Sequence, residues 1–206
     1  MKKTKEFTLT AMFLALMILL AVTPLGFIPL GPINATTMHI PVIIASIVLG
    51  PKIGAGLGSI FGLISLIRAT TMPTVLSFVF SPFIPVIGTS QGSLKSLLIV
   101  FIPRILIGVV PYFVFIGLKK VMKNRRQSIS LFIAGLAGSL VNTILVMNMI
   151  YFLFSASYAD VIGKSGSAVY GAIIAVIATS GIPEAVIAGL ATAGVCAVLL
   201  RLTNKK

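Results

Sequence analysis

The sequence predicts an all-α membrane protein with six transmembrane helices in a single domain, residues 1–206. Of its 206 residues 58% are hydrophobic and only 9% are charged, whereas soluble domains carry about 25% charged residues. The apolar residues form long runs, as a helix that crosses the hydrocarbon core requires. The predicted spans are residues 7–23, 34–49, 53–68, 95–118, 129–153 and 168–200.

Breaks in composition separate these spans. The first span follows a charged tail and looks like a signal peptide, but no small-x-small cleavage pattern follows it, so we expect a retained helix. Gly50-Pro51-Lys52 separates the second span from the third, and the basic segment 119–126 separates the fourth from the fifth. The loops 23–33 and 69–93 are apolar and rich in proline. We expect them to cap a cavity, although segments resting among lipid headgroups would have the same composition.

The basic residues predict the orientation. The chain has 16 Lys and Arg against 3 Asp and Glu, an excess that could indicate nucleic-acid binding. Because these residues cluster in short segments between the spans, the positive-inside rule explains them better. Twelve of them fall in the two tails and the second and fourth loops, against three on the other side. Both termini are therefore expected in the cytoplasm, with the chain in a cell membrane and no nucleic-acid partner.

Two proline–charge pairs lie inside the apolar runs, Pro103-Arg104 and Pro183-Glu184. A charge at membrane depth is costly, so it is usually paired or lines a polar cavity. Each proline also frees the helical carbonyl four residues earlier, here that of Ile99 and of Thr179. Each pair therefore combines a charge with a loosened backbone, which indicates a binding site.

Helical rise places the polar groups of four spans at one level. Counted at about 1.5 Å per residue from the cytoplasmic anchors, Arg104, Asn142, Glu184 and His39 lie about 20–25 Å up, in the outer half of a core about 30 Å thick. The inner halves of the same spans are nearly all apolar. A channel would need polar lining there as well, so the pattern predicts a cup that opens outward.

For several of these residues two interpretations stay open. Arg104 can grip a carboxylate or phosphate with two hydrogen bonds, or it can pair with Glu184. Asn142 can contact a ligand or join helices, and His39 can be an ordinary buried histidine. Asn34, Thr36 and Thr37 can bind a ligand or cap a helix. The candidate substrate-binding residues are Arg104, Asn142, Glu184, Asn34, Thr36, Thr37, His39 and Asn148.

The sequence shows no catalytic chemistry. It has no G-x-x-x-x-G-K-[ST] phosphate loop. One histidine, one cysteine and three scattered acids do not predict a metal site or a nucleophile–base relay. No cofactor, metal or enzymatic activity is expected. A solitary secondary transporter would be expected to show broken helices in an inverted repeat, and none is evident.

Several motifs spread over nearly the whole chain carry a resemblance. Ala11 and Ala15 form a small-residue face on the first span, which suits close helix packing inside the protein or against another protein. With it go residues 31–41 (GPINATTMHIP), 49–52 (LGPK), 61–63 (FGL), 77–83 (SFVFSPF) and 181–184 (GIPE). Together they resemble the substrate-binding S components of energy-coupling factor (ECF) vitamin transporters. Residues 34–41 and 77–83 look most like the pantothenate type.

This resemblance implies a vitamin-binding subunit that supplies specificity only. Its expected partners are a transmembrane coupling protein, which meets Ala11 and Ala15, and two cytoplasmic ATPases that drive uptake. The first outer loop would close over the vitamin, and toppling of the subunit would release it inside. Pantothenate offers one carboxylate for Arg104. Another water-soluble vitamin on the same scaffold, such as pyridoxine, a thiamine precursor, riboflavin or folate, is the alternative.

Overall fold

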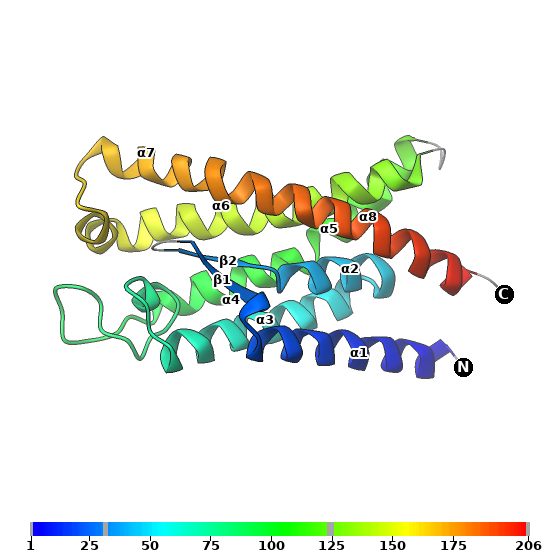
Figure 1. Cartoon of the computed structure of the whole chain (residues 1–206), viewed down its shortest axis with the longest axis horizontal. Helices are drawn as coiled ribbons and strands as arrows, with labels where there is room; N and C mark the ends of the chain where they lie inside the picture. Colours follow the sequence, from blue (N-terminus) through cyan, green and yellow to red (C-terminus); the bar gives the residue numbers. More distant parts are fainter. Residues whose placement is uncertain (1, 31–32, 123–125, 205–206) are drawn as a thin grey trace.

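A computed structural model describes residues 2–30, 33–122 and 126–204 and confirms the helical architecture (Figure 1). Five helical segments in this part of the chain are long and apolar enough to cross a membrane, and α2 is a shorter apolar helix. The start of α1 and the end of α8 lie at the same end of the molecule. The helices are α1 (Lys2–Val22), α2 (His39–Leu49), α3 (Pro51–Thr71), α4 (Lys95–Ile107), α5 (Val110–Val121), α6 (Gln127–Ile162), α7 (Ser167–Val176) and α8 (Ile182–Asn204).

The predicted second span starts too early. Residues 34–36 are not helical, because a short antiparallel hairpin of β1 (Phe27–Leu30) and β2 (Ile33–Thr36) precedes the 11-residue helix α2. Prolines fix the backbone φ and lack an N–H group, so this proline-rich stretch favours an extended hairpin over a helical turn. The hairpin runs between the layer of α6 to α8 and the layer of α1, α3 and α4 (Figure 1).

Two predicted spans are interrupted helices. The span predicted at 95–118 is α4 followed by α5, with a break at Gly108 and Val109. Gly108 faces Gly54 of α3 so closely that a Cβ on either residue would meet the backbone of the other. Gly54, Gly58 and Gly62 repeat every four residues on α3 and all face the α4 side. They form a close helix contact, as small residues allow in membranes.

The last span also contains an irregular turn. A π-helical segment, Ile177–Gly181, separates α7 from α8 just before Pro183. Because Pro183 has no N–H group for the carbonyl of Thr179, a widened turn at this point is the expected local response. The fifth predicted span, 129–153, is longer than expected and continues as α6 to Ile162.

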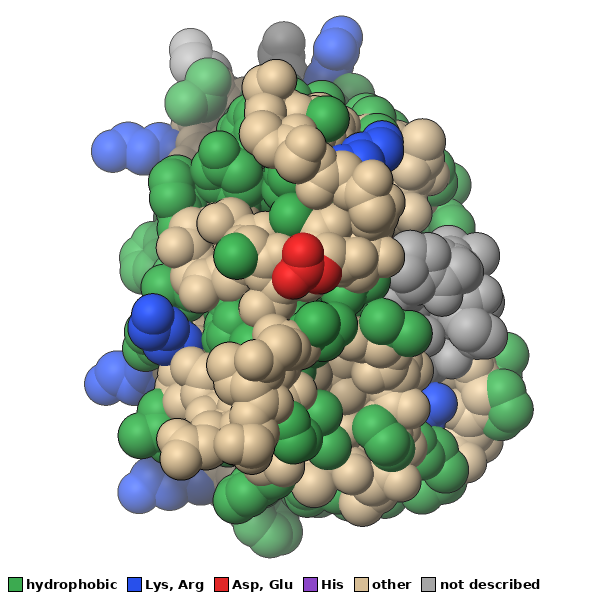
Figure 2. Space-filling model, turned by 90° about the vertical axis from the view of Figure 1, so that its left-hand side faces the viewer, with side chains coloured by type: hydrophobic (Ala, Val, Ile, Leu, Met, Phe, Trp, Pro, Cys, Tyr) green, Lys and Arg blue, Asp and Glu red, His purple; other side chains and the backbone are tan. Residues whose placement is uncertain are grey.

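The long loop between α3 and α4 is partly inside the protein. Its 3-10 turn, Ser77–Val79, is buried, and Phe78 and Val79 join an apolar core with Ile99 and residues of α6 and α7. Phe83, a few residues later, is 71% exposed. The end of the molecule that carries this loop is mostly apolar or uncharged, with sparse charged side chains (Figure 2). The 3-10 turn in the middle of the loop therefore packs between helices, whereas Phe83 after it is exposed.

Candidate substrate site

Arg104 is a buried cation held by its own helix. Its side chain is only 5% exposed, and Nη1 donates a hydrogen bond of 2.9 Å to the carbonyl of Ile99. This is the carbonyl that Pro103 leaves without a helical donor. The side chain of Arg104 therefore satisfies the backbone group that the preceding proline exposes.

Two aromatic rings also contact the guanidinium group. Its central carbon lies 5.5 Å from the ring centre of Phe61 on α3 and 5.3 Å from that of Phe80 in the loop between α3 and α4. Both distances are in the range of cation–π attraction. Nε of Arg104 is buried and has no hydrogen-bond partner among the described residues. The guanidinium group is thus fixed in place, and its Nε–H group is available to an acceptor.

His39 of α2 lies near this cation, and the end of β2 links His39 to Glu184 of α8. His39, the first residue of α2, is 2% exposed and within electrostatic range of Arg104. The backbone of Thr36 at the end of β2 is adjacent to both His39 and the half-buried Glu184 of α8. We call Arg104, His39, Thr36 and Glu184 the inner cluster. It joins three parts of the chain that are far apart in the sequence: the junction of β2 with α2, the helix α4 and the helix α8.

The inner cluster leaves polar atoms uncommitted. Neither ring nitrogen of His39 has a well-aligned hydrogen-bond partner in the described part of the chain, although the backbone of Thr36 is within reach of the ring. Among the described contacts, no ion pair joins Arg104 to Glu184. Buried polar groups are normally hydrogen-bonded, and an exception calls for an explanation such as a ligand or water. The arrangement can therefore accept a small molecule that carries both donors and acceptors.

Asn142 contributes a further uncommitted group on α6. Its Oδ1 atom and the hydroxyl of Ser139 are buried without a partner among the described residues. One turn before Asn142, Gly138 approaches Pro111 and Ile43 so closely that a Cβ would touch both side chains. The glycine thus brings this part of α6 against α5 and α2.

The other predicted residues have different surroundings. The hydroxyl of Thr37 donates a 2.6 Å bond to the carbonyl of Leu25, so it joins the two ends of the hairpin instead of capping α2. Asn148 donates to the carbonyl of Ile144 at 2.8 Å and lies 3.5 Å from the hydroxyl of Tyr170, at the contact of α6 with α7. The side chain of Asn34 lies outside the described residues.

Sequence reasoning missed the two aromatic neighbours of Arg104. Phe61 could have been found from α3, where Gly58, Phe61 and Ser65 recur at helical spacing and are all buried. A Cβ on Gly58 would meet the carbonyl of Arg104, so this face of α3 packs against the turn of α4 that carries Arg104. Phe80 is in a loop, and no periodic pattern points to it.

The comparison with protein families decides the class. The family model of the ECF transporter substrate-specific component matches residues 5–196. The chain belongs to the substrate-specific components of ECF transporters. This S component is 39% identical to the pantothenic acid transporter PanT of Lactococcus lactis subsp. cremoris over 208 residues, which cover 99% of both chains. It is 28% identical to the pantothenate transporter PanT of Leuconostoc mesenteroides subsp. mesenteroides, over 98% of this chain and 96% of the relative.

Family membership confirms the resemblance inferred from the motifs. The matched region includes all of the inner cluster and both alanines of the first helix. Together with the long apolar helices, it identifies a multi-pass membrane protein of a transporter family. The roles of the individual site residues stay predictions.

Proposed function

We propose that this S component binds pantothenate at the outer side of a bacterial plasma membrane, as the specificity subunit of an ATP-driven ECF transporter. The observation that carries the proposal is its likeness, along the full chain, to two proteins named as pantothenate transporters. The charge distribution supports an orientation with both termini in the cytoplasm. The inner cluster then lies in the outer half of the membrane.

The chemistry of the inner cluster suits this ligand. Pantothenate has one carboxylate, one amide and hydroxyl groups. The N–H groups of Arg104 that remain free beside its bond to Ile99 can take the carboxylate. Glu184 and His39 offer acceptors for hydroxyl groups, and Asn142 can both donate and accept at the amide. Binding would then satisfy buried polar atoms that have no partner in the described chain.

The first helix supplies a surface for the transport partners. Ala11 and Ala15 are exposed, whereas Phe13 and Met17 of the same helix are buried against the rest of the protein. Internal packing therefore does not occupy the alanine face. A transmembrane coupling protein can approach closely there. Two ATPases bound to that protein would supply the energy, because the chain itself has no phosphate loop.

Uptake in a host without its own pantothenate transport tests this proposal. Cells that express the S component with a coupling protein and two ATPases should accumulate labelled pantothenate, and cells that express the S component alone should not. Robust uptake by the S component alone would indicate a solitary secondary transporter. Uptake of pyridoxine, a thiamine precursor, riboflavin or folate in place of pantothenate would show another vitamin on the same scaffold.

A further inference from the structure

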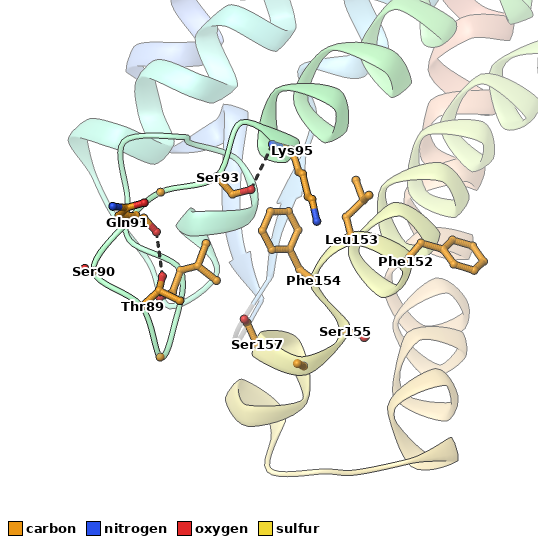
Figure 3. A pocket seen from close by; sticks show the side chains of 14 residues that line it. Thr89, Ser90, Gln91, Ser93, Lys95, Phe152, Leu153, Phe154, Ser155 and Ser157 are labelled. Carbon is orange, nitrogen blue, oxygen red and sulfur yellow. Dashed lines mark hydrogen bonds between the residues drawn. The ribbon is translucent and has the colours of Figure 1, made fainter.

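The end of the molecule that carries the loop between α3 and α4 is hollowed. A cavity of about 710 Å³ lies between loop residues 86–93 and residues 152–157 of α6 (Figure 3). We call it the outer pocket. It is separate from the inner cluster, since none of the four cluster residues lines it.

The loop wall of the outer pocket is held by its own hydrogen bonds. The backbone N–H of Val86 donates to the carbonyl of Gln91 at 3.0 Å, and the hydroxyl of Thr89 lies 2.9 Å and 3.0 Å from the carbonyls of the same two residues. Gly88 occupies a left-handed conformation, φ 82°, which closes the turn. The wall is therefore preformed, which lowers the entropic cost of binding.

The opposite wall comes from a kink in α6. Phe154 has non-helical backbone angles, φ −139° and ψ 28°, within an otherwise continuous helix. Its ring is buried and packs edge-on against Phe78 of the loop, with ring centres 5.7 Å apart. Phe78 is two residues before Phe80, which contacts Arg104. The Phe78–Phe154 contact thus connects the wall of the outer pocket with the loop segment that reaches Arg104.

One cation enters the outer pocket. The side chain of Lys95 points from the start of α4 into the space beside Leu153 and Phe154 (Figure 3). Hydroxyl side chains on both walls face the same space, and the residues that line the pocket include no Asp or Glu. The N-terminus of α4 adds its partial positive charge. This combination favours a small polar molecule with a carboxylate.

We propose that the outer pocket captures the carboxylate of the transported acid on Lys95 before the acid reaches Arg104. The inference rests on the proposed function, which makes that acid pantothenate. Lys95 and Arg104 lie nine residues apart on α4, about 13 Å of helical rise and two and a half turns. They are therefore on opposite faces of the helix, so one carboxylate cannot contact both. The two cations therefore act in succession, and the acid can pass from one to the other only if the Phe78–Phe154 contact opens.

Binding kinetics of the full chain in nanodiscs test the inference, with Lys95→Gln compared with Lys164→Gln. Lys164 lies between α6 and α7 and does not line the outer pocket. At low ionic strength Lys95→Gln should slow pantothenate association about threefold to tenfold, as loss of electrostatic steering does. Dissociation should slow by a similar factor and the Kd should stay unchanged, because Lys95 contacts the acid on the way in and out but not in the final site. Added salt should remove the difference. The analogue with CH₂OH in place of the carboxylate should associate equally fast with both variants.

Three results would overturn the inference. An equal slowing by Lys164→Gln would show general attraction by surface charge. Faster dissociation from Lys95→Gln with an unchanged association rate would make Lys95 part of the final binding site. Wild-type kinetics for Lys95→Gln would remove the outer pocket from the route while the proposed function stands. No pantothenate binding to the wild-type chain would overturn the proposed function and this inference together.

Discussion

Replacement of Arg104 by alanine should weaken pantothenate binding far more than it weakens the fold. The guanidinium is 5% exposed and carries the positive charge of the inner cluster. Truncation of one partner of a buried, hydrogen-bonded charge pair costs about 2–5 kcal/mol. One of the N–H groups of Arg104 is already bonded to Ile99, so we expect a loss near the middle of this range. About 3 kcal/mol corresponds to a roughly 150-fold higher Kd.

The assay is isothermal titration of pantothenate into the purified chain, with the CH₂OH analogue titrated in parallel. Wild-type protein should prefer pantothenate over the analogue, because only pantothenate offers a carboxylate to Arg104. Arg104→Ala should lose most of this preference. Arg104→Lys should be intermediate, since it keeps the charge but not the planar fork of donors.

A double variant separates binding from folding. Arg104→Ala alone leaves the carbonyl of Ile99 without its donor, which costs about 1–3 kcal/mol of stability for a buried group. Adding Pro103→Ala supplies a backbone N–H to that carbonyl and restores the regular helix. The double variant should therefore unfold at a higher temperature than Arg104→Ala and still bind pantothenate weakly. Wild-type affinity in either variant would refute the role of Arg104 as carboxylate partner.

Three further variants probe other parts of the account. Ala15→Leu should leave pantothenate affinity unchanged and abolish uptake with the partners present, because its side chain lies on the exposed face of α1; retained uptake would contradict this. Gly58→Ala should lower the free energy of unfolding by about 1–3 kcal/mol through overpacking, since its Cβ would meet the backbone of α4. Its unfolding temperature should fall accordingly. Gly56→Ala, with open space around it, is the control and should not destabilise. Thr37→Val should cost about 1 kcal/mol and speed amide hydrogen exchange in the hairpin, because it removes the 2.6 Å bond to Leu25; unchanged exchange would contradict the role of this bond.

Local rules predicted much of the fold. Long apolar runs predicted the helices. The glycines at every fourth residue of α3 are typical of a close helix contact, such as the one that Gly54 makes with Gly108. The absence of an N–H group on Pro103 predicted which carbonyl is free, that of Ile99. The donor to this carbonyl is the side chain of the next residue, Arg104. The sequence does not specify this bond, because it depends on the rotamer of Arg104 and on the packing around it.

The hairpin could not be read from the sequence by hydropathy. Residues 34–36 adjoin a strongly apolar run, and composition does not distinguish a helical turn from a strand that is buried between helices. The aromatic contacts of Arg104 depend on the tertiary fold, because Phe80 belongs to a loop that folds back between α3 and α4. The outer pocket has the same origin, since loop residues 86–93 meet the kink at Phe154 more than 60 residues later.

The measurement that tests the central claim most directly is the thermal stability of the purified chain with each water-soluble vitamin in turn. A ligand that binds only the folded state raises the unfolding free energy by about 2.7 kcal/mol at one hundred times its Kd. The account predicts a clear rise in unfolding temperature with pantothenate, a smaller rise with its CH₂OH analogue and none with the other vitamins. A rise with a different vitamin and none with pantothenate would contradict it.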